Sequence, residues 1–301
     1  MMDILFSEEK KIGTIVLNRP SALNALTYEM LALLESHLIK WEESPLIDMV
    51  VITSSNDKAF SAGIDLKTFY QNGLANWQNS YALAELEYRL NRRIFHYKKP
   101  YIAIMHGIVM GGGVGISLHG SHPIATDTMR FALPEVRIGF FPDVGSSYFL
   151  PRLPHKVGWY LAMTGNTITA FDALTIGLVK HVIQADKQKE VLSSLPDRLE
   201  EALFLYQSPY KPSQLDLKKI EHAFSKKSVE EIVKAFGPEN FKGKSQESIA
   251  IAFKQMQKGL TLSFDEAIDY ELSLAKDRLQ SSDLYEGIYY RLIEKRENPK
   301  W

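Results

Sequence analysis

The sequence predicts an α/β protein with parallel strands, and three features lead to this fold class. Runs of β-branched residues alternate with segments of helical periodicity through the first half of the chain. Hydrophobic residues make up 45% of the 301 positions, which is enough for a large core. From about Leu192 onward the sequence is helical and richer in lysine and glutamate. We therefore predict a core over residues 1–205 and a C-terminal helical region over residues 206–301.

The first elements follow one another in an order typical of parallel strands joined by crossover helices. A strand is expected in "KKIGTIVLNRP" (10–20), where Asn-Arg-Pro ends it, and a helix in Thr27–Trp41, where Thr27 is the expected N-cap. A second strand, "DMVVITSSN" (48–56), a helix over Asn79–His96 and a third strand, "YIAIMHG" (101–107), come next.

Composition excludes several function classes. Lysine and arginine total 35 against 36 acidic residues, so no global field attracts nucleic acid or a membrane surface. The absence of cysteine excludes disulfides, thiolate metal sites and thiol nucleophiles. No targeting segment is predicted at the acidic N-terminus, and the apolar window Ile102–Leu118 contains five glycines, which favours burial in protein. We expect a cytoplasmic protein without nucleic-acid or membrane partners.

The glycine-rich stretch "HGIVMGGGVGISLHG" (106–120) matches none of the common glycine motifs. Its spacing fits neither a dinucleotide fingerprint nor a P-loop, and His119 replaces the last glycine of a Gly-x-Ser-x-Gly elbow around Ser117. Three residues are of types that bind metals, namely His119, His122 and Asp127, but no helix face or second cluster supports a metal site. We therefore expect these side chains to pack in loops or at the surface, and we predict no metal.

A glycine turn at a helix start exposes backbone amides that suit an oxyanion. A second small-residue bend, Ala62-Gly63 in "KAFSAGIDL" (58–66), offers a further amide. Taken alone, each bend is better explained as a tight turn.

Together these segments resemble the crotonase, or enoyl-CoA hydratase/isomerase, superfamily. The segments "RPSALNAL", "FSAGIDL", "HGIVMGGGVGIS" and "FALPEVRIGFFPDVGSSYFLPRL" have that family's order and spacing over residues 10–185. The resemblance implies the ClpP/crotonase-like spiral of β-β-α units, with two roughly perpendicular sheets and a C-terminal helical region. It also implies an acyl-CoA ligand, so CoA is expected as part of the substrate and no separate cofactor is predicted.

The resemblance also implies site residues. The backbone amides of Ile64 and Gly112 would form an oxyanion hole, and Arg19 and Lys67 are candidate phosphate partners. Substrate contacts are expected at Glu87, Gly111, Gly115 and Phe140, and CoA contacts, largely through the main chain, at Ala22, Leu23, Asn24, Ala25, Ser61, Ala62, Gly63, Asp65, Leu66 and Lys67.

Acidic residues distinguish the possible reactions. A hydratase of this superfamily carries a glutamate three residues after the middle glycine, where this chain has Gly115, so hydration by a glutamate pair is disfavoured. Glu135 matches the second glutamate, and Asp143 follows eight residues later. Such a pair suits hydrolysis or proton transfer. The alternative is that Glu135 caps a turn and Asp143 forms one.

Further segments are similar to the 3-hydroxyisobutyryl-CoA hydrolase family of valine catabolism. These are "EYRLN", "PEVRIGFFPDVG", and the C-terminal "SFDEAIDYELSLA" and "ENPKW". The similarity implies that Glu135 acts on the thioester carbonyl, either as a nucleophile through an anhydride or as the base for water. Asp143 would orient that group or the substrate hydroxyl and help to protonate the departing sulfur. Glu87 would contact substrate, although a glutamate on a helix is commonly only solvated.

Two other functions remain open. An enoyl-CoA isomerase or acyl-CoA decarboxylase also needs one carboxylate and an oxyanion hole. A non-catalytic acyl-CoA-binding protein would use its lysine-rich region 211–258 to contact a partner, but such charge runs are usually the solvated face of a helix. The resemblance also suggests a homo-oligomer, since relatives often assemble as trimers, although hydrolases vary in this respect.

Overall fold

The computed structural model describes residues 2–296 and 299. The chain forms two compact units, each assembled from three segments. The first unit comprises residues 2–64, 89–131 and 168–214, and the second comprises 65–88, 132–167 and the described residues from 215 onward. The last border between the two units lies at Gln214. Of the "ENPKW" ending (297–301), the structure describes Pro299, and the other four positions lie outside the described residues.

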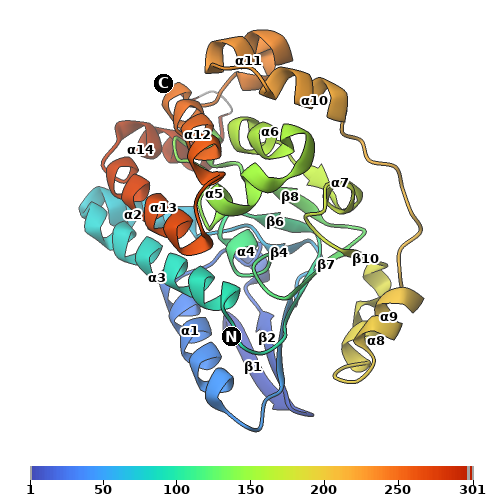
Figure 1. Ribbon diagram of the computed structural model, residues 1–301. Helices are drawn as coiled ribbons and strands as arrows, with labels where there is room; N and C mark the ends of the chain where they lie inside the picture. Colours follow the sequence, from blue (N-terminus) through green and yellow to red (C-terminus); the bar gives the residue numbers. More distant parts are fainter. Residues whose placement is uncertain (1, 297–298, 300–301) are drawn as a thin grey trace. The chain divides into compact units, whose positions relative to one another are not determined.

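The first unit contains two sheets (Figure 1). The larger sheet has the order β1-β2-β3-β5-β7-β10, with β1 (Ile4–Glu9), β2 (Ile12–Leu17), β3 (Met49–Ser54), β5 (Tyr101–Met105), β7 (His122–Thr126) and β10 (His181–Ile183). Strand β1 pairs antiparallel with β2, and every later pair is parallel. The smaller sheet has the order β4 (Ala59–Ser61), β6 (Ile108–Met110), β8 (Arg130–Ala132) and β9 (Ile168–Thr169). The predicted α/β class with parallel strands is confirmed.

Helices cover both faces of the larger sheet. The helices of this unit are α1 (Tyr28–Glu43), α4 (Gly112–Gly115), α7 (Ala170–Thr175), α8 (Gln188–Ser193) and α9 (Leu199–Leu205). Thr27 accepts a hydrogen bond from the Met30 amide, which confirms it as the N-cap of α1. Ile12 packs with residues of α8 and α9, whereas its neighbour Gly13 lies under the Trp41 ring of α1. Because successive residues of a strand face opposite sides, α1 and the α8–α9 pair cover different faces.

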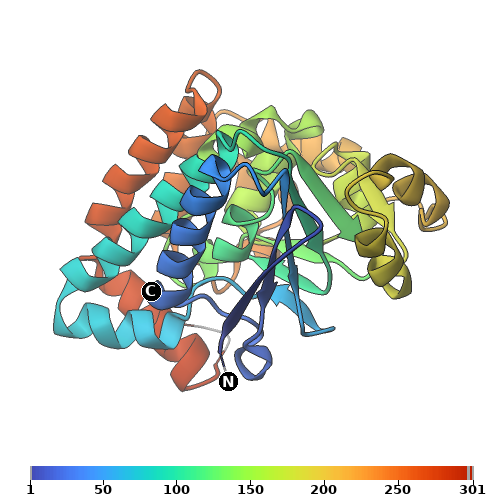
Figure 2. The same cartoon turned by 90° about the horizontal axis from the view of Figure 1, so that it is seen from below.

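The second unit is helical. Its helices are α2 (Leu66–Ala75), α5 (Ser146–Phe149), α6 (Val157–Thr164), α10 (Leu217–Phe224), α11 (Val229–Phe236), α12 (Gln246–Gly259), α13 (Phe264–Arg278) and α14 (Ser282–Ile288). Helix α3 (Trp77–Phe95) supplies its first part to this unit and its last part to the first unit. Helix α12 packs against α6, α13 against α5, and α14 against α2, as Figure 2 shows for the last pair.

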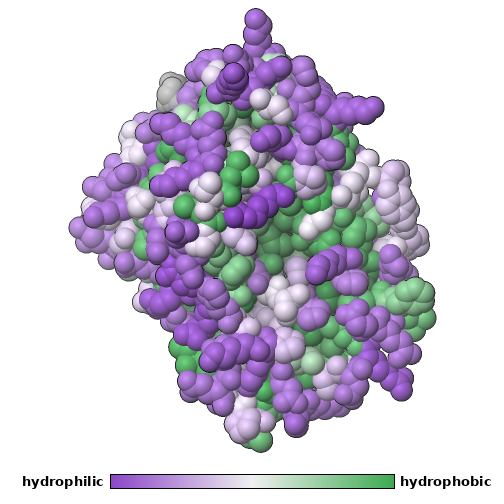
Figure 3. Space-filling view, viewed as in Figure 1, coloured by the Kyte–Doolittle hydropathy of each residue, from purple (hydrophilic) through white to green (hydrophobic). Residues whose placement is uncertain are grey.

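The lysine-rich segment 211–258 forms amphipathic helices in this unit. Helices α10 and α11 bury Ile220, Phe224, Ile232 and Phe236, and hydrophilic side chains cover their outer surface (Figure 3). The charged residues of α10 and α11 therefore lie on a solvated helix face. Within the described part of the chain, no helix combines the length and the apolar character needed to cross a bilayer.

Candidate active site

Two glycine bends lie against each other in the first unit. One follows β4 and the other follows β6, and these two strands pair in parallel, so both bends leave the same edge of the smaller sheet. Gly63 has φ of +96°, and a Cβ built on it would lie 3.0 Å from the Met110 carbonyl oxygen and 3.3 Å from the Gly112 nitrogen. A side chain at position 63 would therefore crowd the second bend.

The amides of Ile64 and Gly112 are unpaired in this arrangement. Neither donates a hydrogen bond to any residue that the structure describes. Gly112 is the first residue of α4, where amides lack intrahelical acceptors. Gly113, one residue later, packs so closely on β4 that an added Cβ would lie 2.7 Å from the Ser61 carbonyl oxygen. Glycine is required here because the strand backbone fills the space of a side chain.

The predicted CoA-binding segment Ala22–Ala25 is held by hydrogen bonds at Asn24. Asn24 is fully buried and donates to the carbonyl oxygens of Ala59 and Phe60, both at 3.1 Å. Ser61 donates to the Asn24 carbonyl oxygen at 2.9 Å. Arg19, a predicted phosphate partner, already pairs with Asp3 at 3.4 Å. The side chains of Asn24 and Ser61 are therefore used within the protein, and contact of this segment with CoA stays a prediction.

Four carboxyl groups gather in the second unit: Glu87, Glu135, Asp143 and Glu271. All four are buried, with at most 9% of the residue exposed. Glu135 lies at the start of a 3₁₀ helix (Glu135–Arg137) that follows β8. Burial first, and then the charge of Asp143, raise the pKa of Glu135 well above its usual range. Its Oε2 atom has no hydrogen-bond partner among the described residues.

Asp143 is oriented by a tyrosine. The Tyr88 hydroxyl donates a hydrogen bond of 2.7 Å to Oδ2 of Asp143. Burial raises the pKa of Asp143 to about 6, and this hydrogen bond opposes the rise. Burial also raises the pKa of Tyr88, so the phenol keeps its proton and acts as the donor. Tyr88 was not predicted as a site residue.

Glu87 and Glu271 complete this cluster. Glu87 is 2% exposed, so the solvated alternative is wrong for it, and burial followed by the charges of Asp143 and Glu135 raises its pKa. The carboxylate of Glu271 in α13 accepts hydrogen bonds from the backbone amides of Gly145 and Ser147, each at 2.7 Å. These two donors oppose the effect of burial, which raises the pKa of Glu271 to about 8. Sequence reasoning did not select Glu271 as a site residue.

The remaining predicted residues divide between the two units. Gly111 precedes α4 in the first unit, and Gly115 is the last residue of that helix. Phe140 is buried in the second unit and stacks on Phe141, with ring centroids 4.4 Å apart. Asp65 caps α2 through the Thr68 amide, and the side chain of Lys67 on that helix is exposed.

Residues considered for a metal have other roles. Asp127 accepts hydrogen bonds from the Ala185 amide and the Ser208 hydroxyl, each at 3.2 Å, so it tethers backbone segments. His122 bonds the neighbouring Ser121 at 2.8 Å. Among the described residues, no group of three histidine or acidic side chains is arranged to hold a metal.

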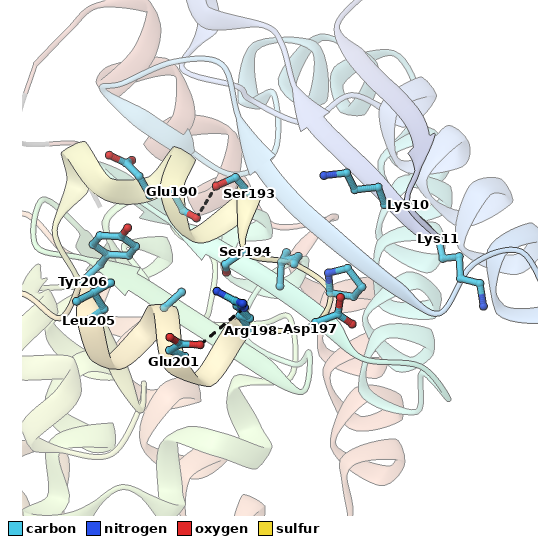
Figure 4. A pocket seen from close by; sticks show the side chains of 13 residues that line it. Lys10, Lys11, Glu190, Ser193, Ser194, Asp197, Arg198, Glu201, Leu205 and Tyr206 are labelled. Carbon is cyan, nitrogen blue, oxygen red and sulfur yellow. Dashed lines mark hydrogen bonds and ion pairs between the residues drawn. The ribbon is translucent and has the colours of Figure 1, made fainter.

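A separate cavity of about 780 Å³ lies in the first unit, between the β1–β2 turn and the helices α8 and α9 (Figure 4). Lys10 and Lys11 line it on the strand side, and Arg198 and Glu201 form an ion pair of 4.0 Å on the helix side. None of the predicted site residues lines this cavity.

Comparison with known proteins identifies the family. The family model described as enoyl-CoA hydratase/isomerase matches residues 12–301. The chain belongs to the enoyl-CoA hydratase/isomerase family. This finding confirms the resemblance indicated by the two glycine bends and by the segment that contains Glu135 and Asp143.

Relatives within the enoyl-CoA hydratase/isomerase family include mitochondrial 3-hydroxyisobutyryl-CoA hydrolases. The protein from Danio rerio is 37% identical over 99% of this chain and 85% of its own length. The human protein is 33% identical over 99% of this chain and 84% of its own length. These names place the relatives in mitochondria, so they do not support the cytoplasmic location expected from the sequence.

Solved structures of the same family share the fold. A carnitinyl-CoA dehydratase from Mycobacterium thermoresistibile has a TM-score of 0.95 and 32% identity, and the match covers 99% of this chain and 91% of that one. An enoyl-CoA hydratase from Rhodobacter sphaeroides 2.4.1 has a TM-score of 0.89 and 28% identity over 100% of this chain and 92% of that one. The predicted crotonase fold is confirmed.

Proposed function

We propose that this chain is a CoA-thioester hydrolase acting on a short branched 3-hydroxyacyl-CoA of the 3-hydroxyisobutyryl type. The observation that carries the proposal is the buried cluster in which Glu135, with an unpaired Oε2, shares its surroundings with Asp143. The names of the curated relatives support the same substrate class. The proposal places the chain in valine catabolism.

The proposed chemistry divides between two sets of groups. The Ile64 and Gly112 amides hold the thioester oxygen and stabilise the negative charge that forms on it. Glu135, once deprotonated, either attacks the carbonyl carbon to give an anhydride, which water then hydrolyses to the free acid, or removes a proton from the water that attacks the carbonyl carbon. A carboxyl group with a raised pKa is the stronger base for the second route. The carbon–sulfur bond breaks, and Asp143 shares in protonating the departing thiolate.

Binding of CoA is assigned to the main chain of Ala22–Ala25 and Ser61–Gly63, with Asp65–Lys67 beside them in sequence. CoA enters as part of the substrate in this proposal. The exposed Lys67 side chain is free to meet a phosphate. Assembly as a homo-oligomer, such as a trimer, remains a prediction that analytical ultracentrifugation tests.

Release of free thiol from 3-hydroxyisobutyryl-CoA tests the function directly. Because the chain contains no cysteine, a thiol reagent detects CoA alone. We expect turnover by the wild type and a loss of about 10²–10⁴-fold in Glu135→Gln, with the exposed Glu201→Gln as the matched control. Absence of thiol release by the wild type, or equal rates in Glu135→Gln, would overturn the proposal.

Two further assays separate the alternatives. Double-bond migration on a 3-enoyl-CoA faster than thiol release would identify an isomerase, and carbon dioxide release from a malonyl-type thioester would identify a decarboxylase. Borohydride reduction during turnover, followed by mass spectrometry, distinguishes the two hydrolytic routes, since only the anhydride converts Glu135 to an alcohol.

A further inference from the structure

Asn91 of α3 carries a buried amide whose polar atoms lack partners. The residue is fully buried, and neither Nδ2 nor Oδ1 has a hydrogen-bond partner among the described residues. Buried polar groups are paired in most native structures, and an unpaired one is costly. Asn24 of the same unit shows the usual pattern, because it is equally buried but donates to Ala59 and Phe60 and accepts from the Arg19 amide.

The Asn91 amide lies against Gly115 within the first unit. A Cβ built on Gly115 would lie 2.7 Å from Nδ2 and 2.9 Å from Oδ1 of Asn91. The amide therefore takes the space that any side chain at position 115 would need. Gly115 ends α4, and Gly112, which carries one of the amides proposed to bind the thioester oxygen, begins it. These two glycines are about one helical turn apart, roughly 4.5 Å along the axis.

We propose that Asn91 recognises a hydroxyl group on the acyl chain of the substrate. This inference rests on the proposed hydrolase function. A hydroxyl both donates and accepts hydrogen bonds, and the asparagine amide offers the matching acceptor and donor without adding charge. The hydroxyl of a 3-hydroxyacyl thioester lies two carbons from the carbonyl, a separation that suits an amide near α4. Asn91 is then a specificity-determining residue, and the glycine at position 115 makes room for it.

Two thioesters that differ only in this hydroxyl test the inference. The substrates are 3-hydroxyisobutyryl-CoA and isobutyryl-CoA, and the variant is Asn91→Leu, which keeps the side-chain size but removes both polar atoms. We expect the ratio of kcat/KM for the hydroxylated over the plain thioester to fall about tenfold. Asn79→Leu, at an exposed position of the same helix, is the matched control and leaves this ratio unchanged.

Thermal unfolding distinguishes recognition from a structural role. Asn91→Leu removes two unpaired buried polar atoms, so its Tm stays the same or rises, whereas Asn24→Leu loses three hydrogen bonds and its Tm falls. An unchanged substrate ratio, or a fall in Tm like that of Asn24→Leu, overturns the inference.

Failure of the hydrolase function is a separate result. It would appear as no thiol release from either thioester by the wild type. In that case, calorimetry measures the affinity of the wild type and of Asn91→Leu for the same two thioesters. We expect the ratio of affinities for the hydroxylated over the plain thioester to fall in Asn91→Leu. An unchanged ratio overturns the inference.

Discussion

The Tyr88 hydroxyl donates a 2.7 Å hydrogen bond to Oδ2 of Asp143, joining residues that are 55 positions apart in the sequence. Both side chains are buried, at 1% and 9% exposure. The bond favours the ionised form of Asp143 against the opposing effect of burial. The protonation state of Asp143 therefore depends on a residue of α3.

Substitution Tyr88→Phe removes this donor and should raise the pKa of Asp143 above about 6. Because Asp143 acts on the departing sulfur in its protonated form, we expect the alkaline limb of the kcat/KM profile, which reports its deprotonation, to move to higher pH. Tyr28→Phe, at an exposed position of α1, serves as the control. A profile unchanged in Tyr88→Phe contradicts the assignment.

Stability should fall as the pH rises from about 5 to 8. Burial raises the pKa of Asp143 to about 6 and of Glu271 to about 8, so the folded state holds more protons than the unfolded state across this range. The stabilising contribution is complete below the unfolded pKa values and is lost as the pH passes the folded ones. We expect a loss of about 1–3 kcal/mol in the free energy of unfolding, measured by urea denaturation.

The Glu87→Gln variant checks the origin of this pH dependence. Burial also raises the pKa of Glu87, so removing this carboxyl group should flatten the dependence. Stability of the wild type that rises over the same pH range would refute the prediction.

Gly113→Ala should impair both folding and turnover. The new Cβ would lie 2.7 Å from the Ser61 carbonyl oxygen, so the α4 start must shift. We expect a loss of about 1–3 kcal/mol in stability and of about 10²–10³-fold in kcat, because the Gly112 amide moves with it. Gly177→Ala is the control, since that glycine has φ of +74° but no atom within 4 Å of an added Cβ. It should lose stability through backbone strain without a change in kcat.

Glu271→Ala should loosen the segment after Asp143. The buried amides of Gly145 and Ser147 lose their acceptor, at a cost of about 1–3 kcal/mol in the free energy of unfolding. The Glu271→Gln variant keeps one acceptor oxygen, so its free energy of unfolding should fall by less than that of Glu271→Ala. Asp277→Ala, at an exposed position of the same helix, provides the comparison. Equal stability of Glu271→Ala and Asp277→Ala would count against this role.

Several site residues could have been found from their place on a helix. In α13 the buried positions Phe264, Ala267, Ile268 and Ala275 form a stripe that also contains Glu271. An acidic residue on an apolar stripe is a signal of a buried carboxylate. The same signal marks Glu87 and Asn91 beside the buried leucines of α3. In the sequence, Glu87 is indicated by the family resemblance as well as by this stripe.

The sequence by itself determined the fold class, the parallel strands, the start of α1 at Thr27 and the two glycine bends, because these depend on local periodicity, capping and backbone freedom. The tertiary structure decided which polar groups are buried and what they meet. Glu271 bonds the amide of Gly145 across 126 positions, and the Asn91 amide lies against Gly115. Such contacts arise only when distant segments pack together. Packing removes water from these groups, which shifts their pKa values and leaves some buried polar atoms without a hydrogen-bond partner, and the chemistry depends on both effects.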